Sequence, residues 1–356
     1  MTGVNVVQSG DNALRGPPPA RDIERPAAPR AARHDLACIT PATMRGLEIG
    51  PLAAPRVRKS EGLVRYLDHA DADGLRQKYA ADPDMQHRLA DIVDVDYVMG
   101  ENQGIYDAVA HDAPFDYVIA SHLIEHIPDP VTWLQDVAKA LRVGGVLSLV
   151  IPDKRYCFDI NRRTSEIGDL VDAHLRGLHQ PSYRQVYDFM SKEIIGKVDT
   201  PAVWAGTADY TGVVRSDVAD PDVAAFELCR DMDEAGGFVD VHCHVFTPDS
   251  FLELYGTLAR LGLIDFEMAY FSPTEVNTLE FFVSLRRLDP KADRRSMMER
   301  QLASVIDAIP ATVPCEAPAD DQRGSPLIME VSRLERSVIT TKRGIVEWVR
   351  GTNRRR

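Results

Sequence analysis

The sequence has few features of a membrane, secreted or disulfide-stabilised protein. No apolar run approaches the roughly 20 residues that a membrane-spanning helix needs, so we expect no transmembrane segment. Residues 1–40 lack the apolar core of a signal peptide, and their prolines, arginines and alanines predict a disordered leader. The five cysteines are far apart and form no Cys-x-x-Cys pair, which argues against disulfide frameworks and zinc ribbons. A cytoplasmic protein is therefore expected.

The chain also lacks an excess of basic residues. It has 41 Lys and Arg against 54 Asp and Glu, a net charge of −13, whereas nucleic-acid binding needs a basic surface. We therefore do not expect a nucleic-acid partner. The exception is residues 322–356, where basic residues outnumber acidic ones and apolar residues repeat in heptads from Leu327 to Trp348. This pattern predicts an amphipathic basic helix that pairs in a homodimer, with weak contact to a membrane surface as the alternative.

Residues 41–156 contain short apolar runs that end in glycine or an acidic residue, as in a parallel nucleotide-binding sheet. The first run ends in Glu48-Ile-Gly50, where glycine lets the backbone approach a ligand. The second ends in Asp68, 20 residues after Glu48, and an acid there accepts hydrogen bonds from ribose hydroxyls. Strands are expected at residues 45–49, 63–67, 93–98, 115–120 and 146–151.

The fourth run leads into Ser121, His122 and the sequence Glu-His-Ile-Pro-Asp-Pro, followed by a helix at 131–141 and a Gly-Gly pair that would end it. In this order the motifs resemble those of class I S-adenosylmethionine-dependent methyltransferases. With Ile-Pro-Asp-Lys-Arg-Tyr at 151–156, they look like the bacterial methyltransferases that occur alongside glycosyltransferases. The chain departs from the family pattern in its first loop, where only one glycine is present.

The resemblance implies a Rossmann-like α/β fold, with a seven-stranded sheet whose last strand is antiparallel, and S-adenosylmethionine as cofactor. Residues 41–156 would form the cofactor-binding half, 157–237 a helical insertion or lid, and 238–287 the second half. Residues 288–356 would be a linker and the basic helix. The implied cofactor-binding residues are Glu48, Gly50, Asp68, Glu101 and Ser121.

The acceptor site is expected where the fourth and fifth strands end. If the acceptor is a hydroxyl, a base must take its proton, and the candidates for this acceptor chemistry are His122, His126 and Asp153. A loop with polar and aromatic side chains follows the fifth strand, and a second histidine pair stands before a helix expected at 248–261. We predict that the acceptor is bound by Lys154, Arg155, Tyr156, His242 and His244.

A divalent metal is the lesser alternative, and we assign no metal ligand. Small-RNA 2′-O-methyltransferases hold a metal with a Glu-x-x-Glu-His turn and a distant histidine, and this chain has His-x-x-Glu-His at 122–126. The sequence predicts methyl transfer to an oxygen of a small molecule or glycan. Two other classes stay open: a non-catalytic binding or scaffold protein, suggested by the depleted glycine loop, and an NAD- or nucleotide-sugar-dependent enzyme.

Overall fold

The computed structural model describes residues 33–82, 85–100, 103–194, 198–213, 217–235 and 238–308. The chain divides into two units, residues 1–33 and 34–356, and the helices and strands belong to the second. The predicted contact of Glu101 and the predicted heptad helix from Leu327 to Trp348 lie outside the described residues. Among the described helices, none is long and apolar enough to cross a bilayer.

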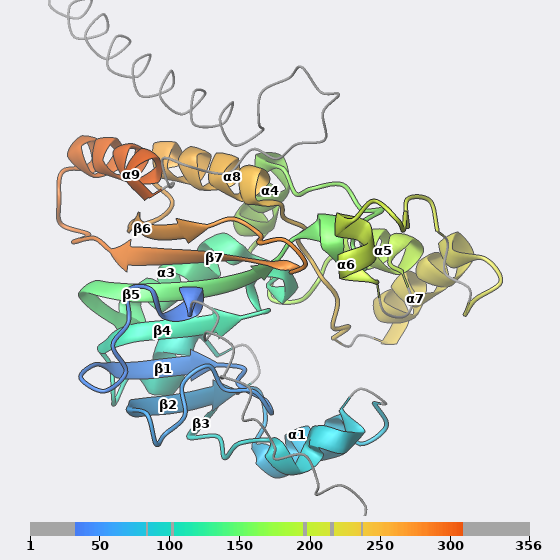
Figure 1. Ribbon diagram of the computed structural model, residues 1–356, viewed down its shortest axis with the longest axis horizontal. Coiled ribbons are helices and arrows are strands. Elements are labelled where there is room, and N and C mark those ends of the chain that lie inside the picture. Colours follow the sequence, from blue (N-terminus) through green and yellow to red (C-terminus); the bar gives the residue numbers. More distant parts are fainter. Residues whose placement is uncertain are drawn as a thin grey trace, which may run out of the picture. The chain divides into compact units, whose positions relative to one another are not determined.

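One seven-stranded sheet organises the fold, in the order β3-β2-β1-β4-β5-β7-β6 (Figure 1). The first five strands are parallel, and β7 is antiparallel to both β5 and β6. This confirms the predicted Rossmann-like methyltransferase sheet with an antiparallel last strand. The strands are β1 Arg45–Ile49, β2 Leu63–Asp68, β3 Tyr97–Val98, β4 Phe115–Ser121, β5 Leu141–Pro152, β6 Phe266–Ser272 and β7 Glu280–Arg287.

The central strands are apolar on both faces because both faces are covered. In β4, Val118 and Ala120 belong to the core beneath the helices, while Tyr117 and Ile119 belong to a smaller core on the other face. This second core is completed by residues 36–44 and by Val57 of the loop after β1. Continuous apolar runs of this kind are typical of parallel strands buried on both sides.

Capping side chains mark where the helices begin, and a stripe of apolar residues packs each of the larger helices against the core. The side chain of Asp129 accepts hydrogen bonds from two backbone N–H groups at the start of α3, and that of Thr247 accepts one at the start of α8. The helices are α1 Ala72–Lys78, α2 Ile105–Val109, α3 Pro130–Ala140, α4 Ile167–Arg176, α5 Tyr183–Lys192, α6 Thr200–Trp204, α7 Pro221–Ala235, α8 Pro248–Leu261 and α9 Arg294–Ala308.

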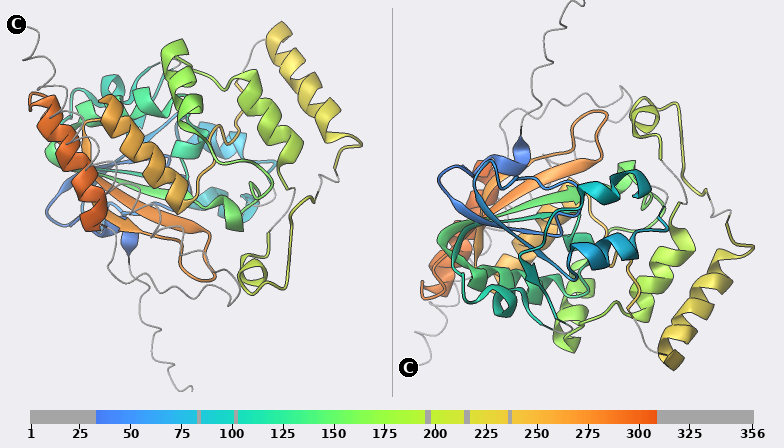
Figure 2. Two further views of the ribbon diagram at one scale, coloured as in Figure 1. Left: turned by 90° about the horizontal axis from the view of Figure 1, so that it is seen from above. Right: turned by 90° about the horizontal axis from the view of Figure 1, so that it is seen from below.

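The segment predicted as an insertion carries helices α4 to α7, and its described residues contribute no strand to the sheet. Figures 1 and 2 show α5, α6 and α7 beyond the ends of β4 and β5, at the edge where the parallel strands finish. Helices α8 and α9 instead lie along one face of the sheet, over β6 and β7. The insertion is therefore placed at the edge where open α/β sheets bind ligands.

Three details differ from the sequence prediction. β5 begins at Leu141, so Gly144 and Gly145 lie inside the strand, where Gly144 has φ of +79° and the register with β4 shifts. The pair therefore forms a bulge and does not end a helix. Helix α9 stands in the segment predicted as a linker, and a short 3-10 turn at His34–Leu36 lies within the predicted leader.

Candidate functional site

The end of β1 is organised by Glu48, which is only 2% exposed. Its carboxylate accepts hydrogen bonds from the backbone N–H groups of Arg56 (2.6 Å) and Val57 (3.1 Å). Burial raises the pKa of Glu48 to about 7, against the two backbone hydrogen bonds, which lower it. Glu48 therefore holds the loop between β1 and β2, and each of its two oxygens accepts one of these hydrogen bonds.

Gly50 follows in the left-handed region, with φ of +66°. A Cβ atom placed on Gly50 would meet no atom within 4 Å, so the backbone is open to a ligand at this point. The chain order reverses beside it, because β2 lies on one side of β1 and β4 on the other. Ligands of open α/β sheets bind in the crevice at such a switch point.

Arg56 reaches across this switch point, and no sequence motif predicted its role. Its Nη2 and Nε donate to the hydroxyl of Ser121, at 2.8 and 3.1 Å, at the end of β4. The same guanidinium lies 3.5 Å from Glu280 at the start of β7. The structure thus brings Ser121 together with the loop after β1, through a cation that the sequence prediction had missed.

Asp68 ends β2 as predicted, at the same edge of the sheet. It is buried, its Oδ1 accepts a hydrogen bond from the backbone N–H of His69 (2.8 Å), and the same oxygen lies 2.7 Å from the His69 ring. Helix α1 begins four residues after Asp68 and carries Lys78, which contacts the other ring nitrogen of His69 at 3.2 Å. The described contacts leave the second oxygen of Asp68 available to a ligand.

His122 follows β4 in the left-handed region, with φ of +50°. Its N–H donates to the carbonyl of Val150, and its ring Nε2 lies 2.7 Å from Glu280. Burial alone would lower the pKa of His122, but the hydrogen bond with Glu280 and the charge of Glu125 raise it overall. Glu280, also missed from the sequence, therefore orients the histidine predicted to act on the acceptor.

The turn after His122 carries a buried carboxylate. Glu125 is 1% exposed, and neither of its oxygens has a hydrogen-bond partner among the described residues. His126, one residue later, is half-buried, and its Nδ1 lies 2.9 Å from Asp240. Burial lowers the pKa of His126, whereas the Asp240 hydrogen bond and the Glu125 charge together raise it above its usual value.

The two histidines before α8 have different surroundings. His242 is buried with its Nδ1 2.6 Å from Asp159, whose carboxylate also pairs with the buried guanidinium of Arg162 at 2.8 Å. His244 contacts Ser165 and the carbonyl of Pro128, and burial lowers its pKa to about 4. His244 is therefore a neutral packing residue, and its predicted contact with the acceptor gains no support from this placement.

The residues after β5 are partly structural. The buried carboxylate of Asp153 receives bonds from the Arg155 guanidinium, the shortest at 2.6 Å, and from the Thr274 hydroxyl at 2.7 Å. Tyr156 stacks on Trp204 of α6, with ring centroids 4.1 Å apart. Burial lowers the pKa of Lys154. Both oxygens of Asp153 accept hydrogen bonds from neighbouring side chains. The catalytic role predicted for Asp153 therefore stays a prediction.

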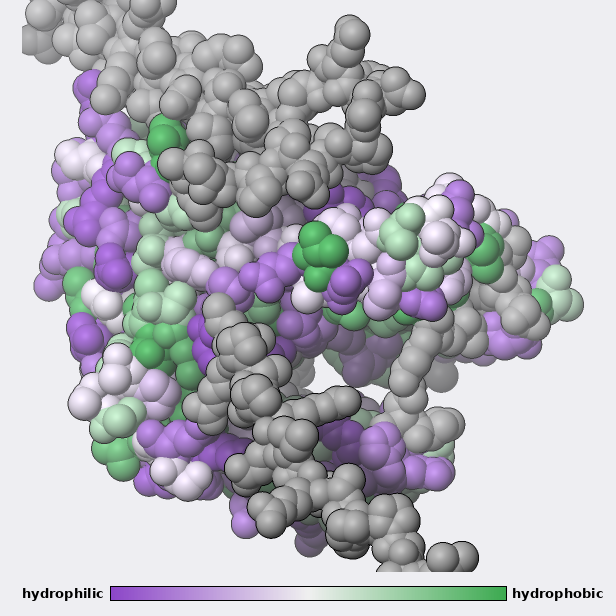
Figure 3. All heavy atoms as spheres, in the orientation of Figure 1, coloured by the Kyte–Doolittle hydropathy of each residue, from purple (hydrophilic) through white to green (hydrophobic). Residues whose placement is uncertain are grey.

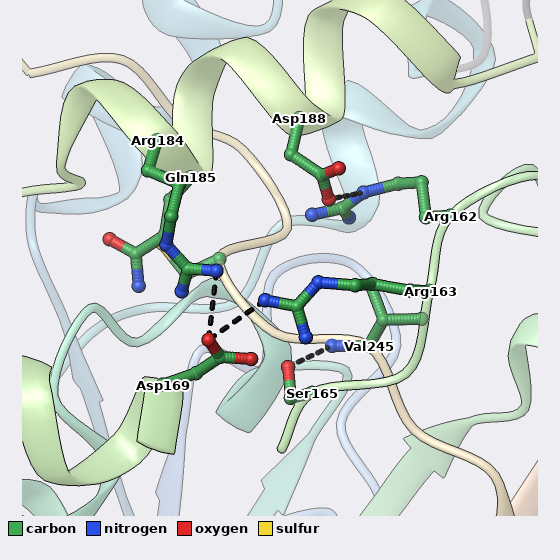
Figure 4. Close-up of a pocket in the computed structure, with 9 residues that line it drawn as sticks. Arg162, Arg163, Ser165, Asp169, Arg184, Gln185, Asp188 and Val245 are labelled. Atoms are coloured by element: carbon green, nitrogen blue, oxygen red, sulfur yellow. Dashed lines mark hydrogen bonds and ion pairs between the residues drawn. The ribbon is translucent and has the colours of Figure 1, made fainter. Parts of the chain in front are cut away.

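Two cavities lie in the insertion. The first, of about 10 Å³, holds roughly one water molecule and is closed by the ion pairs of Arg163 and Arg184 with Asp169 (Figure 4). The second, of about 660 Å³, lies between α5 and α7 and is lined by the rings of Tyr183, Tyr187 and Phe226 among charged side chains. The second cavity has room for a small ligand.

The surface is hollowed between the insertion and α1 (Figure 3). Lys78 of α1 lies 3.8 Å from Asp240, and Asp240 in turn contacts His126. Gln185 of α5 donates to the carbonyl of Pro128, in the loop just before α3. These contacts connect α1, the turn after β4 and helix α5 of the insertion.

Comparisons with known proteins found one family model and several solved structures. A family model described as a methyltransferase domain matches residues 22–193, just under half of the chain. No curated protein matches the sequence. Among solved structures, an S-adenosylmethionine-dependent methyltransferase from Mesorhizobium loti is 16% identical, covering 70% of this chain and 93% of that one, with a TM-score of 0.33.

Two further structures are similar at the same level. A methyltransferase from Methanosarcina mazei is 16% identical, covering 69% of this chain and 92% of that one, with a TM-score of 0.30. The CcbJ methyltransferase of Streptomyces caelestis is 12% identical, covering 74% of this chain and 99% of that one, with a TM-score of 0.34. The family match supports S-adenosylmethionine as the cofactor, in agreement with the sequence prediction.

Proposed function

We propose that the protein transfers a methyl group from S-adenosylmethionine to an oxygen atom of a glycan or another hydroxylated small molecule. One observation carries the proposal: the sheet order puts Gly50, Asp68 and Ser121 at one edge, around the switch point between β1 and β4. The match of residues 22–193 to a methyltransferase domain supports it.

The residues at this edge fit the three ends of the cofactor. The open backbone at Gly50 gives room for close approach, and the second oxygen of Asp68 is placed to accept from a ribose hydroxyl. A guanidinium binds carboxylates through paired N–H groups, so Arg56 suits the carboxylate of the methionine end. The cofactor supplies a methyl group on an already activated sulfonium.

The protein's own part is to align the acceptor and receive its proton. His122 is suited to this because Glu280 fixes its ring and its backbone is anchored to Val150. The Nε2–H of His122 donates to Glu280 when the ring is neutral, which leaves Nδ1 to accept a proton from an acceptor hydroxyl. Of the predicted acceptor-side residues, His122 has the clearest support from its contacts.

A glycan acceptor is favoured by the aromatic residues of the insertion. Tyr156 and Trp204 form a stacked pair after β5, and the 660 Å³ cavity presents tyrosine and phenylalanine rings beside arginine and aspartate side chains. Sugar rings pack on aromatic faces while their hydroxyl groups bond to charged side chains, and pockets of this size suit small ligands. Helix α5 lines this cavity and also contacts the residues just before α3.

Calorimetric titration of S-adenosylmethionine and S-adenosylhomocysteine into the full-length protein and Asp68→Ala tests the cofactor site. A charge-assisted hydrogen bond from ribose to the available oxygen of Asp68 contributes up to about 3 kcal/mol, so we expect affinity to fall about 100-fold. The control is Asp73→Asn, because that side chain is 93% exposed in the adjacent helix. Binding of NAD or a nucleotide sugar instead of S-adenosylmethionine would refute the proposal.

The acceptor is tested separately, by release of S-adenosylhomocysteine in the presence of hydroxylated small molecules and oligosaccharides. Turnover with a sugar hydroxyl, and none with amine or thiol analogues of the same size, is the expected result. Tight cofactor binding without turnover on any hydroxylated acceptor would favour the scaffold alternative. Turnover restricted to amine or carbon acceptors would keep the enzyme class and overturn the proposed methylated atom.

A further inference from the structure

Glu125 is a buried carboxylate whose partner is missing among the described residues. Both oxygens lack a hydrogen bond, and the ring of His122 comes within 4 Å, with its Nδ1 3.7 Å from Oε1. Burying a carboxylate without donors is costly, and nearly all such groups in proteins are paired or bound to a metal. The environment of Glu125 is thus incomplete as it stands.

Two imidazoles face this carboxylate. One ligand atom from each of Glu125, His126 and His242 lies within 4.8 Å of the other two. The ring centroids of the two histidines are 4.5 Å apart, with one ring edge-on to the other. In the part of the chain that the structure describes, this is the one group of three such ligands that comes together.

In both His126 and His242, Nδ1 is hydrogen-bonded and Nε2 remains for a metal. Nδ1 of His126 contacts Asp240 at 2.9 Å, and Nδ1 of His242 contacts Asp159 at 2.6 Å. A carboxylate accepts and does not donate, so each Nδ1 carries the hydrogen and a neutral ring presents the lone pair of Nε2. Metal-binding histidines are oriented by carboxylates in this way.

The backbone fixes the three residues in register. The N–H of His244 donates to the carbonyl of Glu125 at 3.0 Å, and the thiol of Cys243 donates to the carbonyl of His126 at 3.3 Å. The segment with His242 therefore runs beside the turn with Glu125 and His126, although more than 100 residues separate them in the sequence. His244 takes no part, because both of its ring nitrogens already have partners.

We propose that Glu125, His126 and His242 bind one divalent first-row transition-metal cation, with zinc as the best match. Two imidazole nitrogens and one carboxylate oxygen are ligands shared by zinc, manganese and iron sites. Metal–ligand distances of 2.0–2.2 Å put neighbouring ligand atoms about 3–3.5 Å apart, so small side-chain rotations close the 4.8 Å group.

Three protein ligands leave a coordination position open, as in catalytic zinc sites. The site directly follows His122, so the cation is placed to hold an oxygen of the acceptor. This role rests on the proposed function, whereas the binding of the cation does not. Binding and role are therefore tested by different measurements.

The binding test uses full-length protein without a histidine tag, stripped of metal and dialysed against zinc or cobalt(II). Elemental analysis should give one equivalent of zinc, and cobalt(II) should give the visible absorption bands of a low-symmetry site. Glu125→Gln keeps the side-chain shape and removes the charge, and we expect it to abolish stoichiometric binding. His179→Gln is the matched control, because that histidine is exposed and outside the group.

Asp240→Asn tests the arrangement around the ligands. It removes the carboxylate that orients His126, and the expected loss of zinc affinity is about 10–100-fold. His242→Gln should also lose the cation. Since His242 contributes to a buried ion-pair network, circular dichroism must first show that the variant is folded, and His126→Gln at a half-exposed position replaces it otherwise.

Absence of zinc and cobalt binding in the intact protein would overturn the proposal. So would stoichiometric binding that survives both Glu125→Gln and His126→Gln, because the cation would then lie elsewhere. S-adenosylmethionine titrated into the metal-free protein separates the two claims. Cofactor binding without metal binding refutes the metal site alone, and metal binding without cofactor binding refutes the proposed function alone.

Discussion

Glu48 and Glu125 are both buried acids beside the carboxyl end of the sheet, and their surroundings are opposite. Glu48, in β1, accepts backbone hydrogen bonds from Arg56 and Val57, so both its oxygens are used within the fold. Glu125, in the turn after β4, has no hydrogen bond to either oxygen among the described residues. Buried acids with complete partners stabilise structure, and an incomplete one marks a place for a ligand.

The same contrast divides the site into two edges. At the proposed cofactor edge, around β1 and β2, Glu48 holds a short loop where related proteins have a glycine-rich turn. At the proposed acceptor edge, after β4 and β5, histidines and carboxylates from distant segments contact one another. We therefore expect changes at one edge to leave the ligand of the other edge in place.

The largest expected effect comes from His122→Gln at the acceptor edge. Loss of a positioned proton acceptor typically lowers turnover about 10²–10⁴-fold. The affinity for S-adenosylmethionine should stay within about twofold, because His122 lies on the acceptor side. Steady-state kinetics with the best acceptor, beside cofactor titration, measures both. An unchanged kcat would remove His122 from the chemistry.

Glu48→Gln should act on stability. The pKa of Glu48 is raised to about 7, above its ordinary value near 4.5, so the folded protein holds this proton more tightly. The stability from this proton is fully present below pH 4.5 and is lost as pH rises through 7. Glutamine has no such proton. As the pH rises from 4.5 to above 7, the unfolding free energy of the wild type minus that of the variant should therefore fall by up to about 3 kcal/mol.

Urea unfolding of both proteins at several pH values between 5 and 8 checks this prediction. Glu61→Gln is a suitable comparison, because Glu61 lies exposed in the same loop and its side chain accepts a hydrogen bond from the Arg58 N–H. A difference in unfolding free energy that grows with pH, or does not change, would show that Glu48 is ionised throughout and that its role is purely that of an acceptor.

The smallest expected effect is that of Arg56→Gln. Its guanidinium contacts Ser121 and Glu280, and we expect it to bind the carboxylate of the cofactor. One such pair at a partly exposed position corresponds to about a tenfold loss of S-adenosylmethionine affinity. Arg56→Lys should recover part of it. Decarboxylated S-adenosylmethionine should bind wild type and variant equally, and a tenfold difference with that ligand would contradict the assignment.

The cofactor edge was largely predictable because its signals are local in the sequence. Apolar runs ending at Gly50 and Asp68 indicated β1 and β2, and the Ser-Pro turn before the last apolar run indicated the antiparallel β7. The carboxyl ends of parallel strands meet at one edge of a sheet, so the residues after each predicted strand can be placed together. The bounds of β5 were missed because a bulge at Gly144 interrupts its pattern.

The acceptor edge was less predictable because its partners are remote. Glu280 lies 158 residues from His122, and Asp240 lies 114 residues from His126, so no spacing rule connects them. Arg56 stands in a loop without a motif. The sequence predicted the same role for His242 and His244. The structure distinguishes them, because His242 lies beside Glu125 whereas both ring nitrogens of His244 bond to neighbouring groups in the core.

The division into two edges is tested most directly by titrating S-adenosylmethionine into Glu125→Gln and Asp68→Ala under one set of conditions. We predict affinity within about twofold of wild type for Glu125→Gln and a loss of about 100-fold for Asp68→Ala. Equal losses in the two variants, with both folded, would contradict separate edges and place Glu125 in the cofactor site itself.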